Sequence, residues 1–237
     1  MRKKLMIFVM ALAALVFIAL FLDNSVFVLK DVRISGESGM DDTDVVRLAH
    51  VEFGGHMRNM DKAEIKRSIE LSGALKCIDV ATEMPSTLVI TVERRQGRFV
   101  TDYGGNIALM DGDGYVISTT REIPDGEFLY VTGLSPASAV PGRKIGAHND
   151  RISAMHAVLS AIDKTGCGGY ISELNVDNVD SLYFYSRTGI QVMLGDTGNM
   201  ESKLIWMKYA LLDLESRGET SGKLDVTSGT QADYRHD

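Results

Sequence analysis

The sequence has few cysteines and none of the short signatures of common enzymes. Its 237 residues contain only Cys77 and Cys167, which is too few for a disulfide framework; two buried thiols are the favoured reading, with one long-range bridge as the alternative. There is no Gly-x-Ser-x-Gly elbow, no serine followed three residues later by lysine, no Gly-x-Gly-x-x-Gly and no P-loop. The five histidines lack the spacing of zinc ligands on a helix. The sequence therefore indicates no catalytic residue, metal, cofactor or small-molecule substrate.

A long run without charge lies near the start of the chain. Leu5–Leu22 are eighteen residues without a charged or polar side chain, and three basic residues precede them. As a helix this run extends about 27 Å, close to the apolar thickness of a bilayer, and it predicts a single transmembrane helix over residues 5–22. A cleaved signal peptide is the alternative, but its apolar stretch is shorter and ends in small residues, unlike Phe21–Asp23.

The basic residues before this run predict the orientation of the chain. Because positive charge stays on the cytoplasmic side, residues 1–4 are expected to be a cytoplasmic tail and residues 23–237 to be extracytoplasmic. Residues 23–237 hold all 32 acidic residues and 22 of the 25 basic ones, a net charge of about −10. Such a surface repels phosphate backbones, so nucleic acid is not expected as a partner.

Residues 27–95 show a pattern of strand, helix, helix, strand, strand. Asp61 with Glu64 three residues later forms an Asp version of the capping box at the start of the second helix. Two helices can cover one face of a three-stranded sheet. The expected strands are 27–35, 77–84 and 84–95, the expected helices are Asp42–Ala49 and one that begins at Asp61, and the expected buried positions are Val32, Ile34, Val80, Leu88, Ile90 and Val92.

After Gly97 the pattern changes to short strands separated by glycine-rich turns. Two amphipathic helices interrupt the strands, one around Ile152–Ile162 and one capped by Asn199 that runs to about Ser216. The last ten residues, 228–237, are expected to be a tail. The expected strands are Phe99–Tyr103, Asn106–Met110, Tyr115–Ser118, Ile171–Val176, Ser181–Ser186, Ile190–Leu194 and Lys223–Thr227.

Three local features have a functional and a structural interpretation. Asp111–Gly114 begins like a calcium loop, but Tyr115 and Val116 occupy the positions of a third ligand and of the sharp-turn glycine, so a hairpin turn is favoured. His156 lies within a helix, where a structural role is expected. Trp206 is expected to be part of the core. The terminal strand, in contrast, can accept a strand from a partner if one side of it is unpaired, which suggests a binding protein.

Several stretches in order resemble the FtsQ/DivIB family of bacterial division proteins. MPSTLVITVERR is similar to the Pro-x-x-Leu-x-Ile-x-Val-x-Glu-Arg signature of the family's POTRA domain. IALMDGDGYVI resembles its Asp-x-x-Gly hairpin. The stretches that carry the resemblance are VRISG (Val32–Gly36), GGHMRNMDKAEIKRSI (Gly54–Ile69), MPSTLVITVERR (Met84–Arg95), IALMDGDGYVI (Ile107–Ile117) and IQVMLGDTGNMESKLIWM (Ile190–Met207).

The resemblance implies a fold class and a domain organisation. The chain would be a single-pass membrane anchor followed by α+β structure, with a POTRA domain (27–95), a β-rich domain containing two helices (96–227) and a C-terminal tail (228–237). At Lys203, a position of the family pattern, a role in stabilising the turn and helix start is expected.

The resemblance also implies a function and a site. The protein would be a non-enzymatic scaffold of the divisome that binds FtsL-like and FtsB/DivIC-like proteins at the septum of the cell membrane and helps to regulate septal cell-wall synthesis. The first strand and second helix of the POTRA domain would be a further candidate contact with division or translocation components. Thr227 replaces a basic residue found in many relatives. The implied partner-binding residues are Lys223, Leu224, Asp225, Val226 and Thr227, with Trp206 and Tyr209 if exposed.

Three alternatives have less support. A POTRA-bearing assembly chaperone usually carries repeated POTRA modules or a barrel, and neither is recognisable here. An anchored envelope enzyme would need a site built from scattered residues such as Asp111, Asp113 or His156. A sensor would need a cytoplasmic output domain, which residues 1–4 cannot form.

Overall fold

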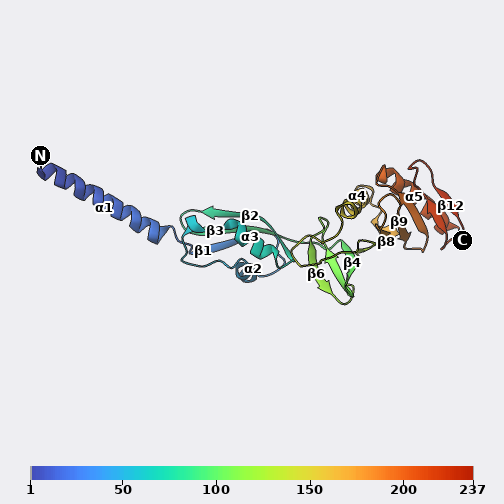
Figure 1. Ribbon diagram of the computed structural model, residues 1–237, viewed down its shortest axis with the longest axis horizontal. Helices are drawn as coiled ribbons and strands as arrows, with labels where there is room; N and C mark the ends of the chain where they lie inside the picture. The colour runs from blue at the N-terminus through green and yellow to red at the C-terminus, as the bar shows by residue number, and fades with distance from the viewer. Residues whose placement is uncertain (1, 237) are drawn as a thin grey trace. The chain divides into compact units, whose positions relative to one another are not determined.

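The chain forms two compact units, Met1–Arg94 and Arg95–Asp237. The structure is a computed structural model that describes residues 2–236, without the side chains of residues 2–5 and 18–25 (Figure 1). The N-terminal unit contains a three-stranded sheet, and the C-terminal unit contains a nine-stranded sheet. Each unit has its own cluster of buried hydrophobic residues.

The N-terminal unit begins with the helix α1 (Arg2–Val26), which is 25 residues long. The side chains of residues 6–17 on this helix are exposed. Among the described residues, no helix reaches the length and apolarity required of a membrane span. Residue 1 lies outside the described residues, as do the side chains of residues 2–4 of the predicted cytoplasmic tail. The same holds for the side chains at the two ends of the predicted span, Leu5 and residues 18–22.

The rest of the N-terminal unit has the expected order of strand, two helices and two strands. The central strand of the sheet pairs in parallel with the first strand and antiparallel with the second, as β1-β3-β2. The elements are β1 (Asp31–Ser35), α2 (Asp42–Leu48), a short 3₁₀ helix (Met57–Asn59), α3 (Lys62–Glu70), β2 (Leu75–Glu83) and β3 (Thr87–Arg94).

Local interactions explain where these elements begin. The Asp61 carboxylate accepts hydrogen bonds from the backbone N–H groups of Ala63 and Glu64 at 2.9 and 3.0 Å, so α3 starts as its capping pattern predicts. Ile65 and Ile69 of α3 are buried against the sheet. The first strand is shorter than expected because only its second half pairs with β3.

The C-terminal unit is a mixed sheet of nine strands in the order β12-β11-β10-β9-β8-β7-β4-β5-β6. Two long helices, α4 (Asn149–Thr165) and α5 (Met200–Ser216), pack against each other. The strands are β4 (Phe99–Tyr103), β5 (Asn106–Met110), β6 (Val116–Thr120), β7 (Leu129–Thr132), β8 (Ile171–Asn175), β9 (Leu182–Ser186), β10 (Gln191–Gly195), β11 (Lys223–Asp225) and β12 (Asp233–Arg235).

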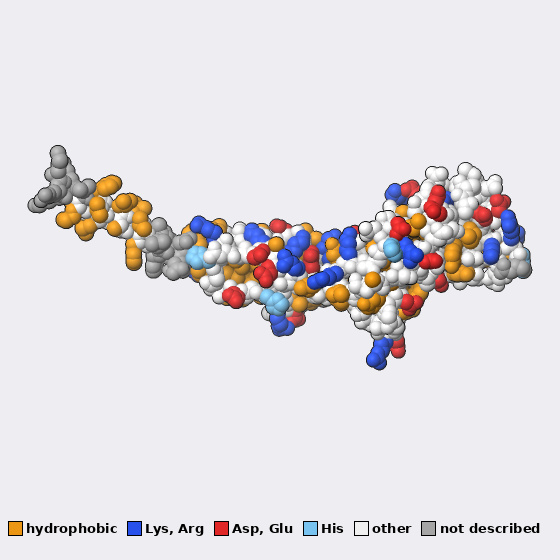
Figure 2. Space-filling model, viewed as in Figure 1, with side chains coloured by type: hydrophobic (Ala, Val, Ile, Leu, Met, Phe, Trp, Pro, Cys, Tyr) orange, Lys and Arg blue, Asp and Glu red, His pale blue; other side chains and the backbone are white. Residues whose placement is uncertain are grey.

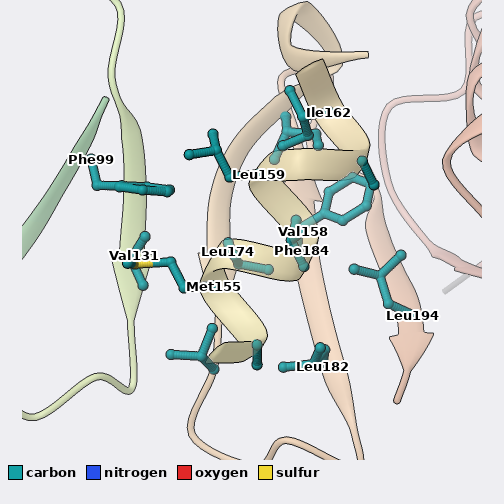
Figure 3. Packing of buried hydrophobic residues seen from close by; sticks show 14 of the residues in the cluster. Phe99, Val131, Met155, Val158, Leu159, Ile162, Leu174, Leu182, Phe184 and Leu194 are labelled. Atoms are coloured by element: carbon teal, nitrogen blue, oxygen red, sulfur yellow. The ribbon is translucent and has the colours of Figure 1, made fainter. Parts of the chain in front are cut away.

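The helices cover one face of this sheet. In Figure 3, residues of α4 such as Met155 and Leu159 lie beside inward-facing strand residues such as Leu174 and Phe184. Alternate strand residues such as Tyr185 point to the opposite face, where they are partly exposed. The sheet therefore has a covered face and an open face, as expected for a largely antiparallel sheet.

Two strands of the C-terminal unit were not expected from the sequence. β7 lies between β4 and β8, in a stretch where the sequence predicted no strand. β12 lies within the stretch expected to be a tail and pairs antiparallel with β11. The expectation that Lys223–Thr227 is the last regular element, with one side unpaired, is therefore wrong: β11 pairs with β10 on one side and with β12 on the other.

Candidate partner-binding surface

The predicted strand Lys223–Thr227 contributes both core and surface residues. Leu224 and Val226 are fully buried under the helices, whereas Lys223, Asp225 and Thr227 are exposed. A partner can therefore contact the exposed side chains, but the backbone of β11 is already paired on both sides.

The strand that ends the sheet is β12. Among the described residues, no strand pairs with its outer side. Tyr234, in the middle of β12, is half-buried, packs against the core and donates a hydrogen bond from its hydroxyl to the Ser221 carbonyl at 2.6 Å. This anchor fixes a strand of only three residues at the edge of the sheet, the position at which a sheet can accept a further strand.

Sequence reasoning did not identify Asp233, Tyr234 or Arg235 as site residues. A strand of three residues is too short for alternation to be recognised, and its neighbours are glycine, serine and charged residues typical of a tail. The one available signal was the alternation of Ala232 and Tyr234, which are the partly buried residues of this segment.

Trp206 and Tyr209 lie on the solvent face of α5. Their side chains are 43% and 65% exposed, and Ile205 and Leu212 on the same face are also exposed. Trp206 is thus not the core residue that the sequence led us to expect. Figure 2 shows hydrophobic side chains at the surface of the C-terminal unit, among acidic and basic ones. This exposed side of α5 points away from the sheet, so the structure does not bring Trp206 and Tyr209 onto the open face with Lys223 and Asp225.

Lys203 connects the start of α5 to the turn before it. Its side chain is 2% exposed, and the ammonium donates to the carbonyl and to the carboxylate Oδ1 of Asp196, both at 2.9 Å. A Cβ built on Gly229 would lie 3.6 Å from Lys203 Cγ, so the loop between β11 and β12 covers the lysine stem. Lys203 therefore has the structural role expected at this turn and also supports the terminal strands.

This contact makes a pH-dependent contribution to stability. The hydrogen bond from Lys203, and then the Gly198 N–H, hold the pKa of Asp196 below its usual value of 3.8. A depressed folded-state pKa gives stability that is present above the unfolded pKa and is lost as pH falls through the folded one. Asp196→Asn should therefore lower the Tm near neutral pH, and the gap to the parent should close below about pH 4. Thermal unfolding between neutral and acid pH measures this; a gap that stays constant down to about pH 2 would contradict it.

Asp111 belongs to the hairpin and not to an open site. Its Oδ1 accepts hydrogen bonds from the N–H groups of Asp113 and Tyr115 at 3.0 and 2.8 Å, and its Oδ2 pairs with buried Arg95. The Arg95 guanidinium also lies 4.3 Å from the centre of the Tyr115 ring. The turn between β5 and β6 is thus the expected hairpin.

The three residues considered for an enzyme are only partly brought together. Asp113 and His156 line one open cavity of about 510 Å³, whereas Asp111 does not. His156 Nε2 is buried and has no hydrogen-bond partner among the described residues. The carboxylate of Asp111 is occupied by Arg95 and backbone donors, so Asp111 is not available as a general base.

Cys77 and Cys167 are both free and buried, as expected, one in each unit. Burial raises the pKa of the Cys77 thiol. A raised pKa lowers the thiolate fraction at neutral pH, so Cys77 is not an activated nucleophile.

Comparison with known proteins gives a consistent set of relatives. No family model matches the chain. It is 23% identical over 198 residues to a cell division protein FtsQ of Rickettsia bellii, a match that covers 81% of this chain and 71% of that protein. It is 28% identical over 92 residues to the cell division protein FtsQ of Caulobacter vibrioides, covering 39% of this chain and 30% of that protein.

Proposed function

We propose that the chain, which is similar to cell division proteins named FtsQ and resembles the FtsQ/DivIB family, is a non-enzymatic scaffold of the divisome. In this role it binds FtsL-like and FtsB/DivIC-like proteins at the septum and helps to regulate septal cell-wall synthesis. The observation that carries the proposal is the edge of the C-terminal sheet, where no strand of the described residues pairs with the outer side of β12.

Strand addition at β12 is the proposed mode of binding. A partner strand can form main-chain hydrogen bonds to the outer side of β12, while side chains on the open face add specificity. Lys223, Asp225 and Thr227 are exposed beside this edge, whereas Leu224 and Val226 hold β11 in the core. The partner strand thus pairs with β12, and its side chains contact the exposed residues of the neighbouring strand β11. The backbone pairing of β11 stays as it is.

The exposed face of α5 is a second proposed contact. Trp206 and Tyr209 are large aromatic residues of the kind that anchor protein interfaces. Because this face points away from the sheet, it serves a different partner or a different segment of the same partner. FtsL-like proteins are the candidates for this surface.

The membrane anchor remains part of the proposal. Support for it is the uncharged run of residues 5–22 and the three basic residues that precede it. With this orientation, residues 23–237 lie outside the cytoplasm. The proposed extracytoplasmic part consists of a POTRA domain over 27–95 and a β domain over 96–227.

Two proline variants of β12 test strand addition. Successive residues of a strand direct their N–H groups to opposite edges, so Tyr234→Pro and Arg235→Pro remove one inward and one outward donor. The variant that loses the outward donor should fold like the alanine variant at the same position and bind the FtsB/DivIC-like protein of the same cell about tenfold or more weakly than that alanine variant.

Alanine variants at the same two positions are the controls, because they remove the side chain and keep the N–H group. Binding is measured with the full chain in nanodiscs and the purified extracytoplasmic region of the partner. If both folded proline variants bind as tightly as their alanine controls, strand addition at β12 is wrong.

A further inference from the structure

The two outermost strands place like charges directly opposite each other. In the antiparallel pair of β11 and β12, Lys223 faces Arg235, and Asp225 faces Asp233. All four side chains are exposed on the open face of the sheet. Directly opposite side chains on a sheet lie within about 5.5 Å at Cβ, and like charges there are destabilising.

Neighbouring residues do not neutralise either pair. On β10, the residues in register with Lys223 and Asp225 are Gln191 and Met193, which carry no charge. Within the described part of the chain, Lys223 and Arg235 form no ion pair. Asp225 accepts hydrogen bonds from Thr227, and Asp233 accepts one from Gln231, all from uncharged donors.

The two pairs form a surface with a cationic and an anionic end. Opposite charges are diagonal neighbours, which are typically about 7–8 Å apart and interact weakly when exposed. A partner strand beside β12 would place its own side chains next to Arg235 and Asp233. Since residues two apart share a face of a strand, each charge of β12 would meet one side chain of the partner.

We propose that these four residues recognise a partner strand that carries an acidic side chain beside Arg235 and a basic side chain beside Asp233, two residues apart. The proposal rests on the strand addition proposed above and defines its partner: acidic-x-basic if the partner strand runs antiparallel to β12, basic-x-acidic if it runs parallel. Binding would offset the repulsion that each like-charge pair causes in the free protein.

Charge-reversal variants distinguish a role of these charges in partner binding from a role in stability. Arg235→Glu converts its pair with Lys223 into an attractive one, and Asp233→Lys does the same with Asp225. Each variant should therefore have a higher Tm than the parent and yet bind the FtsB/DivIC-like protein of the same cell about fivefold more weakly. Arg121→Glu, after β6 at the opposite end of the sheet, makes the same change in net charge as Arg235→Glu and should leave binding unchanged.

Salt provides a second readout with the full chain in nanodiscs. At about 1 M salt, where the screening length is about 3 Å, the difference in affinity between parent and variants should disappear. If the parent binds and both variants bind equally well, the charges serve only to discourage unspecific strand pairing at the edge, and the inference is wrong. If the folded parent does not bind at all, the proposed function fails instead.

Discussion

Asp111→Ala is expected to lower the free energy of unfolding of the C-terminal unit by about 3–5 kcal/mol. The carboxylate of Asp111 forms an ion pair with the Arg95 guanidinium, and the two side chains are only 10% and 2% exposed. Without it, a buried positive charge remains next to the Tyr115 ring, and no other acidic side chain of the described residues forms an ion pair with it. The chain has a single tryptophan, Trp206, which lies in this unit, so unfolding in urea can be followed by its fluorescence.

The control is a double variant, Arg95→Met with Asp111→Ala, which removes both charges. Replacing a buried ion pair by apolar residues is often close to neutral, so the double variant should recover a large part of the lost free energy of unfolding. The recovery is incomplete because the N–H groups of Asp113 and Tyr115 still lose their acceptor. If Asp111→Ala costs less than about 1 kcal/mol, the pair is solvated and our account of this hairpin is wrong.

Gly36→Ala is expected to destabilise the N-terminal unit by at least about 2 kcal/mol. Gly36 has φ +89°, and a Cβ there would lie 2.1 Å from the carbonyl oxygen of Val92. A methyl group must therefore push apart the end of β1 and the central strand of the sheet. Hydrogen exchange of the amides in β1 and β3 measures the loss.

Gly54→Ala is the matched control for this prediction. Gly54 also has a positive φ, +82°, but a Cβ there would meet nothing within 4 Å. It should show only the conformational cost of about 1 kcal/mol. Equal effects of the two substitutions would show that the contact with Val92 does not matter.

The N-terminal unit was predictable because its signals are local. Asp61 caps α3 through the two hydrogen bonds that its position implies, and Ile90 and Val92 alternate into the core. The glycine after the first strand is explained by its close approach to Val92. The expected order of elements in this unit and the resemblance to the FtsQ/DivIB family are both confirmed.

The end of the C-terminal sheet was not predictable in the same way. β12 has three residues, and its position depends on Tyr234 reaching the Ser221 carbonyl, a tertiary contact that no periodic pattern encodes. Trp206 was misjudged because α5 carries apolar residues on both faces, so the sequence does not distinguish the buried face from the exposed one. The charge pairs of β11 and β12 depend on the register between the two strands, and this register is known only from the structure.

The central claim is that this chain binds division proteins through the terminal edge of its sheet. The most direct test is a binding isotherm of the full chain in nanodiscs with the purified extracytoplasmic region of the FtsB/DivIC-like protein from the same cell. We predict saturable binding that an Arg235→Glu substitution weakens while raising the Tm. Absence of binding by a chain with intact tryptophan fluorescence and a cooperative unfolding transition would contradict the account.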